Sequence, residues 1–144
     1  GVTRMVDIGI EPYLVAATVV GIVGQRLVRL VCEACAEDVQ PPAQLVAEVA
    51  SKRPDIPKPR FRRGWGCEAC GGTGYRGRTG LYELMPMSEE LRARVVRSAP
   101  LGEIRVLAET QGMAPLRSGG WDKACAGITT LDEVLRVTRD EALE

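Results

Sequence analysis

Histidine is absent from this 144-residue sequence, and its absence removes several kinds of chemistry. Without an imidazole, the chain holds neither a Ser-His-Asp nor a Cys-His nucleophile system. Any metal site must therefore use cysteine and carboxylate side chains. The dipeptide Gly-Lys is also absent, so the sequence contains no phosphate-binding loop of the Walker A type. Taken alone, the chain shows no complete active site.

An excess of either charge is lacking too, because Lys+Arg and Asp+Glu both number 19. This balance argues against a general nucleic-acid binder, which usually has a basic excess. The longest apolar stretch, residues 13–23, is too short to span a bilayer. Since the sequence begins with Gly1 and not with Met, we interpret it as part of a longer protein.

The hydrophobic pattern alternates between helical and extended segments, which predicts an α/β fragment. Residues 13–20 are apolar nearly all round, so we expect a buried helix there. Residues 64–80 contain seven glycines, which favours tight backbone turns over a helix. The strands that we expect cover 22–31 and 81–85. The expected helices cover 2–8, 13–20, 43–50, 89–98, 102–110, 116–126 and 131–137.

Two helix starts carry specific capping signals. Ser88 precedes a pair of glutamates and is a good N-cap. The run Thr130-Leu-Asp-Glu133 has the spacing of a capping box, in which Thr130 and Glu133 each satisfy a backbone N–H of the other. Both helices are therefore expected to begin sharply.

Four of the five cysteines form two CxxC motifs, Cys32-Glu-Ala-Cys35 and Cys67-Glu-Ala-Cys70. This spacing lets two thiolates reach one tetrahedral ion, and two such motifs complete a closed four-thiolate shell. We therefore predict one structural zinc ion, with no position open to water or substrate. Glycines beside the second motif are expected to let the backbone curl so that its N–H groups face the sulfurs: Gly66, Gly71 and Gly72. Nearby arginines are expected to screen the remaining thiolate charge: Arg60, Arg62, Arg63, Arg76 and Arg78.

Other interpretations of these residues are open. The four cysteines would form two disulfides in a small secreted protein, but nothing in the sequence indicates secretion. A further alternative is that they are four unrelated buried cysteines. Cys125 stands alone and is interpreted as a small buried apolar residue. Residues 71–80 resemble a phosphate cradle superficially, but directly after a CxxC motif their glycines are better explained as knuckle and turn residues.

Four stretches of the chain resemble the type II secretion and type IV pilus assembly ATPases, in family order. The second CxxC motif with its tail, Gly66-Cys-Glu-Ala-Cys-Gly-Gly-Thr-Gly-Tyr-Arg-Gly-Arg-Thr-Gly-Leu-Tyr-Glu83, is the most specific. The C-terminal run Ala126-Gly-Ile-Thr-Thr-Leu-Asp-Glu-Val-Leu-Arg-Val-Thr138 is also specific. The remaining two stretches are residues 2–16 and 24–32.

The resemblance implies a hexameric motor ATPase of the cytoplasm, peripheral at the inner membrane. Such an enzyme uses ATP and Mg²⁺ to drive pilin or pseudopilin assembly and protein secretion, and works against an inner-membrane platform and other cytoplasmic-membrane secretion proteins. Its nucleotide motifs would lie upstream of this chain, so the fragment alone is expected to be inactive. No nucleic-acid partner is implied.

The resemblance also implies a division of the chain into three parts. Residues 1–31 would end a RecA-like P-loop ATPase core, 32–80 would form an inserted tetracysteine zinc subdomain, and 81–144 would provide a strand and a C-terminal helical subdomain. Cys32, Cys35, Cys67 and Cys70 match the family's zinc motif residue by residue. The sequence names no catalytic or nucleotide-binding residue.

Two points stay open at the level of sequence. Gln25 and Arg26 are placed near the missing core, either beside nucleotide or a subunit interface or, as we favour, on an exposed strand edge. The competing function is a zinc-dependent binding module. It would be either a chaperone zinc region of the DnaJ type, for which only one of the CxxC motifs continues with glycines, or a zinc-ribbon nucleic-acid binder, supported by the short basic run 60–63.

Overall fold

The computed structural model describes residues 2–56 and 58–139, and these contain both helices and strands, as predicted. They divide into two compact units. The first unit comprises residues 1–24 and 83–115, and the second comprises 25–82 and 116–144. The α-helices are α1 (Val2–Asp7), α2 (Pro12–Thr18), α3 (Ala43–Lys52), α4 (Glu89–Val96), α5 (Leu101–Thr110), α6 (Leu116–Cys125) and α7 (Leu131–Val137). The strands are β1 (Gly21–Val31), β2 (Ala36–Asp38), β3 (Arg62–Gly64) and β4 (Tyr75–Pro86), and a short 3-10 helix, η1, covers Glu68–Cys70.

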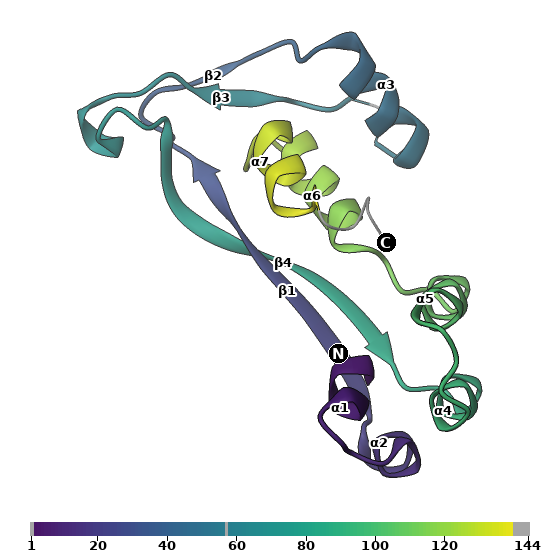
Figure 1. Cartoon of the computed structure of the whole chain (residues 1–144). Coiled ribbons are helices and arrows are strands. Elements are labelled where there is room, and N and C mark those ends of the chain that lie inside the picture. The colour runs from purple at the N-terminus through teal and green to yellow at the C-terminus, as the bar shows by residue number, and fades with distance from the viewer. Residues whose placement is uncertain (1, 57, 140–144) are drawn as a thin grey trace. The chain divides into compact units, whose positions relative to one another are not determined.

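Strands β1 and β4 pair with each other in a two-stranded sheet and run in opposite directions (Figure 1). At one end the Cys32 N–H donates to the Gly74 carbonyl at 2.9 Å, and at the other the Met87 N–H donates to the Val20 carbonyl at 3.0 Å. Strand β4 begins at Tyr75, so the prediction that turns continue to residue 80 was wrong. Pairing with β1 outweighs the low strand propensity of the glycines in this stretch.

The first unit is built around α2, α4 and α5. Its fully buried core gathers one face of each helix, with Val15 and Ala16 from α2 and Leu91 and Val95 from α4. Ser88 caps α4 as predicted, because its Oγ accepts a hydrogen bond from the Leu91 N–H at 3.2 Å. Amphipathic packing therefore organises this unit without any contribution from residues 25–82.

Helix α2 is not buried all round, contrary to the prediction. It ends at Thr18, and only Val15 and Ala16 are fully buried. Tyr13 is 59% exposed and Leu14 is also exposed. The helix packs on α4 and also on α1, and its exposed apolar residues Tyr13 and Leu14 lie outside the buried core of this unit.

The second unit contains α3, α6 and α7 together with β2 and β3. Its largest core cluster joins Val49 of α3 and Phe61 to Trp121 of α6 and Val134 of α7. Gly120 lies where α6 passes closest to α7, and a Cβ there would meet the methyl groups of Val134. Glycine is therefore required inside this helix by packing, despite its cost in helix propensity.

Glu133 is the buried charge of this unit, with none of its side chain exposed. Its carboxylate accepts hydrogen bonds from the Arg29 side chain at 2.7 Å, from the Arg29 backbone N–H at 3.1 Å, and from Arg136 at 2.7 Å. The capping box is thus only half present. Thr130 Oγ1 accepts from the Glu133 N–H at 3.1 Å, but the Glu133 carboxylate is committed to the two arginines.

Electrostatics at Glu133 favour the charged form. Burial is the largest single influence and raises its pKa, but the hydrogen bonds from Arg136 and Arg29 together outweigh burial and lower the pKa to about 2. The carboxylate therefore stays ionised and holds β1 against α7. Arg29 is itself positioned over the Tyr75 ring, with its guanidinium carbon 4.1 Å from the ring centroid.

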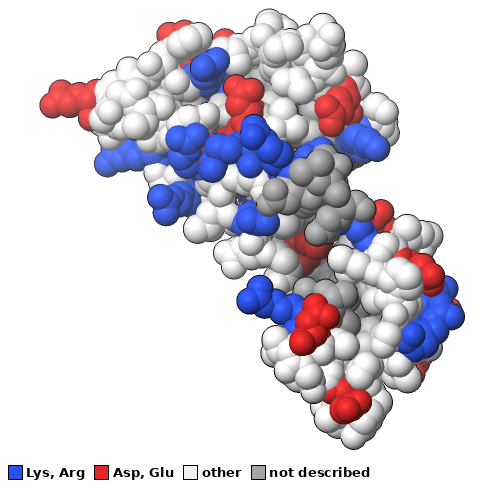
Figure 2. All heavy atoms as spheres, in the orientation of Figure 1, with Lys and Arg blue, Asp and Glu red and all other residues white. Residues whose placement is uncertain are grey.

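Cationic side chains gather on the face of the second unit drawn in Figure 2, interspersed with acidic ones. Several of the arginines in this unit are paired with carboxylates, including Arg60 with Asp38 and Arg62 with Glu33. Among the residues that the structure describes, no helix combines the length and the hydropathy needed to cross a membrane.

Replacing Glu133 with Gln should lower the free energy of unfolding by about 2–4 kcal/mol, because two guanidinium groups lose a buried anion. Chemical denaturation measures this loss. The matched control is Glu103→Gln, which removes a half-exposed carboxylate paired with Arg94 and Arg97 in the first unit and should cost under about 1 kcal/mol.

The loss should also depend on pH. The pKa of Glu133 falls from an ordinary 4.5 to about 2 in the folded chain, so its stabilisation is complete above pH 4.5 and disappears as the pH falls through about 2. The stability difference between the native chain and Glu133→Gln should shrink over that window. A difference that stays constant from neutral pH to pH 2 would contradict the assignment.

Candidate metal centre

The two CxxC motifs lie at corresponding ends of paired strands. Cys32 directly follows β1 and Cys35 directly precedes β2, while Cys67 and Cys70 flank and end η1, between β3 and β4. Strands β2 and β3 pair antiparallel, with Ala36 opposite Gly64. Strand pairing therefore brings together two motifs that are 35 residues apart in sequence.

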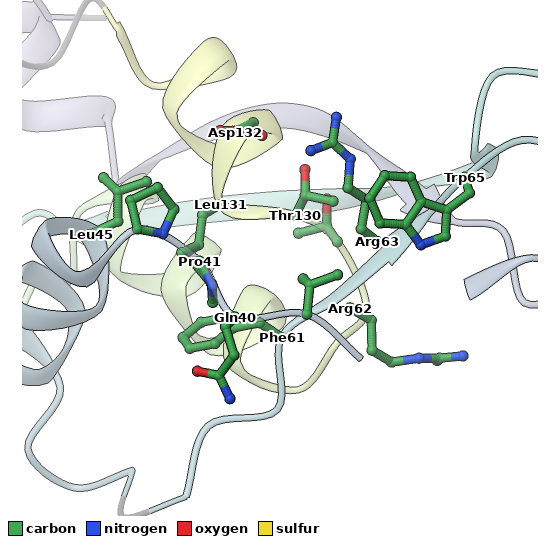
Figure 3. A pocket seen from close by; sticks show the side chains of 13 residues that line it. Gln40, Pro41, Leu45, Phe61, Arg62, Arg63, Trp65, Thr130, Leu131 and Asp132 are labelled. Atoms are coloured by element: carbon green, nitrogen blue, oxygen red, sulfur yellow. The ribbon is translucent and has the colours of Figure 1, made fainter. Parts of the chain in front are cut away.

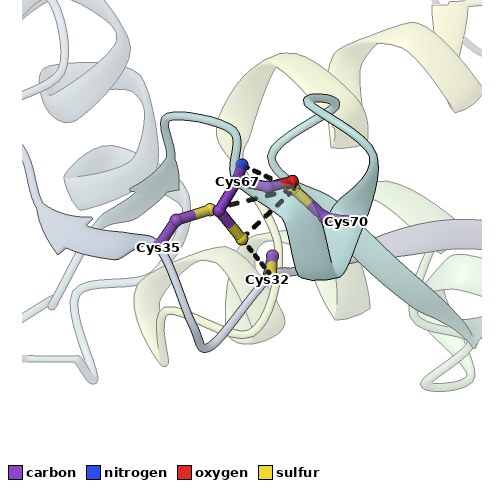
Figure 4. A group of neighbouring side chains, drawn as sticks. All are labelled: Cys32, Cys35, Cys67 and Cys70. Carbon is purple, nitrogen blue, oxygen red and sulfur yellow. Dashed lines mark hydrogen bonds between the residues drawn. The ribbon is translucent and has the colours of Figure 1, made fainter.

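The four cysteine sulfurs form one compact cluster, all within 4.8 Å of one another (Figure 4). The Sγ–Sγ distances are 3.9 Å for Cys32–Cys67, 4.0 Å for Cys35–Cys70 and 3.8 Å for Cys67–Cys70. A tetrahedral zinc ion with Zn–S bonds of about 2.3 Å separates its sulfurs by about 3.8 Å. The donor set and its spacing thus fit such an ion, and the cluster can hold a metal.

Backbone N–H groups point at two of the sulfurs. The Gly66 N–H donates to Cys35 Sγ at 3.3 Å, and the N–H groups of Cys67 and Gly74 each donate to Cys70 Sγ at 3.2 Å. Gly66 therefore acts as predicted. Gly71 and Gly72 have positive φ and shape the turn around Cys70, while their own N–H groups donate to the carbonyls of Glu68 and Cys67. The N–H groups of Gly66, Cys67 and Gly74, which donate to sulfur, stabilise thiolates and orient the ligands.

Gly64 and Gly74 allow the closest backbone approach at the centre. A Cβ on either residue would overlap the carbonyl group of the other. Gly74 also has φ +75°, which suits glycine. Gly64 was not singled out from the sequence, and Gly74 only as one of the knuckle and turn glycines of residues 71–80.

The protonation of the cluster is set by its surroundings. The Cys67 backbone N–H is the main reason that the pKa of Cys70 is lowered to about 6, which makes its sulfur a thiolate at neutral pH. Desolvation raises the pKa of Cys35 to about 11. A metal ion must therefore displace the Cys35 proton when it binds.

The alternatives for the cysteines do not fit this geometry. All five are free, and the Sγ–Sγ distances between the two motifs are far longer than the roughly 2.05 Å of a disulfide bond. Their convergence also rules out four unrelated buried residues. Cys125 lies apart from the cluster, in the core with Trp121 and Val134, as expected of a small buried residue. Burial raises its pKa.

The nearby arginines are engaged elsewhere. Arg60 pairs with Asp38 at 2.9 Å, and Arg62 pairs with Glu33 at 2.8 Å. Arg63 stacks over Trp65, 5.3 Å from the ring centroid. The partners found for these three guanidinium groups are therefore carboxylates and an aromatic ring. Gln25 and Arg26 lie exposed on β1, where the sequence placed them, and any role beside nucleotide or a subunit interface stays a prediction.

The chain belongs to the family described as "Type II/IV secretion system protein", which matches residues 1–136. Particular relatives include the "Type IV pilus assembly ATPase PilB" of Thermus thermophilus, 41% identical over 137 residues, which are 95% of this chain and 15% of that protein. The "Type II secretion system protein E" of Pseudomonas aeruginosa is 40% identical over 97% of this chain and 27% of that protein. The "Type IV pilus assembly ATPase TfpB" of Acinetobacter baylyi is 38% identical over 94% of this chain and 23% of that protein.

These relatives are much longer than the chain, which spans 15% of the first, 27% of the second and 23% of the third. The family resemblance inferred from the sequence is thereby confirmed. What the matches establish is membership of the secretion and pilus assembly ATPase family.

Replacing Cys67 with Ser should abolish stoichiometric metal binding, because three thiolates and a hydroxyl no longer satisfy a four-thiolate site. Metal content by mass spectrometry is the measurement, and Cys125→Ala is the control that should keep its metal. The amide signals in NMR spectra should change throughout the second unit. Those of α4 and α5 should not change, because none of the described residues of 25–82 belongs to the core of the first unit. Full metal content in Cys67→Ser would disprove the four-cysteine site.

Replacing Gly64 with Ala should destabilise the second unit by at least about 2 kcal/mol, because the new methyl group overlaps the Gly74 backbone. Thermal or chemical unfolding reports the change. Gly119→Ala is the matched control. It lies in α6 with open space around its Cβ position and should be neutral or stabilising by up to about 1 kcal/mol.

Proposed function

We propose that this chain is the C-terminal part of a hexameric motor ATPase that couples ATP hydrolysis to pilin or pseudopilin assembly and to protein secretion. The observation that carries the proposal is the family match over residues 1–136. Curated relatives at about 40% identity that are named as pilus assembly ATPases and type II secretion proteins support it. Hydrolysis itself is assigned to a part of the protein that this chain does not contain.

Within that protein, we infer that residues 1–31 end a RecA-like core, 32–80 form the zinc subdomain and 81–144 add a strand and the C-terminal helical subdomain. The absence of His and of a Gly-Lys dipeptide supports placing the ATP and Mg²⁺ site upstream. The protein is proposed to work in the cytoplasm, peripheral at the inner membrane, with platform and other secretion proteins as partners.

The metal is proposed to be Zn²⁺ in a structural role, held by Cys32, Cys35, Cys67 and Cys70. Four soft thiolates select zinc over hard cations such as Mg²⁺ or Ca²⁺. Four protein ligands also leave no position for water or substrate, so the ion would contribute to folding and not to catalysis. The N–H donors at Gly66, Cys67 and Gly74 support this assignment, because they offset thiolate charge.

The purified chain should contain one zinc ion per molecule and show no ATP hydrolysis above a buffer control. It should also cause no salt-dependent shift of DNA or RNA, because several of its arginines are paired with carboxylates. ATP turnover by the chain alone would refute the assignment of catalysis to an upstream core. A salt-dependent shift would favour the zinc-ribbon alternative instead.

A further inference from the structure

A pocket of about 360 Å³ opens in the second unit and belongs to neither the metal centre nor the ATPase assignment (Figure 3). Strand β3, the segment leading into α3 and the first turn of α7 form its walls. Its apolar lining includes Val39, Leu45, Phe61 and Leu131, which are also members of the second unit's core cluster. The pocket is therefore a place where that core remains open to the surface.

Strand alternation explains which side chains face the pocket. Arg63 is the central residue of β3, and Phe61 and Trp65 flank the strand at a spacing of two residues, which places the three side chains on one face. Val39 is on the same face of the paired strand, opposite Phe61, whose carbonyl accepts its N–H at 2.9 Å. Arg62 also lines the pocket, but its guanidinium pairs with Glu33. The paired strands β2 and β3 thus place apolar Val39 and Phe61 at one end of this face and the Arg63 cation beside the Trp65 ring at the other.

Trp65 and Arg63 form the mouth of the pocket. Trp65 remains 61% exposed, although a residue of its size usually buries most of its surface. The Arg63 guanidinium carbon lies 5.3 Å from the centroid of its ring. Stacking of this kind orients the guanidinium and leaves its N–H groups available to an anion.

Arg63 differs from its neighbours in lacking a carboxylate partner. Glu37 is directly opposite it in the strand register, yet no ion pair joins them in the described part of the chain. Arg60 and Arg62, by contrast, are both paired. Asp132 lines the pocket from the α7 side, so a second anion would be repelled there. The mouth therefore suits a single negative charge on the Trp65 side.

We propose that this pocket binds an extended peptide segment of a partner protein, with an apolar side chain against Phe61 and Leu131 and a nearby carboxylate on Arg63. An aromatic-lined apolar cavity with one oriented charge is the usual form of a peptide hot spot. One unpaired guanidinium is too little for an anionic membrane or a nucleic acid, both of which need several cations. The proposal does not depend on the motor assignment.

The test uses the zinc-loaded chain and a library of random linear peptides displayed on phage. Selected peptides should share an apolar residue within a few positions of Asp or Glu. Synthetic versions, measured by fluorescence anisotropy, should bind Trp65→Ala and Arg63→Glu about tenfold more weakly or worse. Asp132→Asn should bind them about twofold more tightly, because it removes a like charge from the pocket.

Arg60→Glu is the matched control, since it reverses a charge near the pocket on a residue that does not line it. It should leave the affinity unchanged. Zinc content and unfolding curves of all four variants establish that each is folded. Because Asp132→Asn predicts a gain of affinity, general damage to the fold cannot imitate the full pattern.

Several results would overturn the proposal. One is a selection that yields no shared motif, or peptides that lack a carboxylate and bind Arg63→Glu as well as the native chain. Another is self-association in sedimentation that Trp65→Ala abolishes, which would make a second copy the occupant. Trp65-dependent binding to vesicles containing phosphatidylglycerol would make the site a lipid contact. None of these results would bear on whether the parent protein hydrolyses ATP.

Discussion

The sulfur atoms of Cys32, Cys35, Cys67 and Cys70 lie within 4.8 Å of one another. Folding of the second unit therefore brings four thiol groups together, and their ionised forms repel one another. Two thiolates about 4 Å apart repel each other by about 4 kcal/mol at an effective dielectric constant of 20. The cluster therefore needs either protons or a cation. Three backbone N–H groups reduce the repulsion, but they reach only Cys35 and Cys70. A divalent ion held by all four sulfurs would neutralise this charge, and its binding would then be part of folding.

The cluster closes the chain between the two CxxC motifs, and that closed segment supplies much of the second unit's core. Residues 36–66 contain β2, α3 and β3. From this segment Val49 and Phe61 pack against Trp121 and Val134 of the C-terminal helices. Closing a segment of this length costs conformational entropy, which a bound metal would offset. The apolar core and the metal site would then depend on each other, whereas none of the described residues of this segment belongs to the core of the first unit.

The sequence was most informative where a short local pattern is enough to determine the structure that its residues adopt. The CxxC spacing, Ser88 as an N-cap, and most helix positions belong to this class. It was less informative where a distant partner decides. Residues 75–80 were expected to turn, but pairing with β1 makes them a strand. Glu133 was expected to cap its own helix, but Arg29, 104 residues away, takes its carboxylate. Apolar surface on α2 was expected to be buried, and no sequence pattern reveals which face finds a partner.

Glu133 also explains how the pocket keeps its shape. Replacing a buried ion pair with apolar residues is often neutral or stabilising, so its value lies more in positioning than in stability. Here it fixes the start of α7 against β1, helped by Thr129, whose hydroxyl donates to the Arg29 carbonyl at 2.8 Å. The Tyr75 and Thr130 hydroxyls share a further hydrogen bond of 2.8 Å, which ties the same turn to β4. Strand β1 ends beside the cysteine cluster and β4 begins beside it. The wall of the pocket that carries Leu131 is therefore connected, through these two strands, to the residues that would bind the metal.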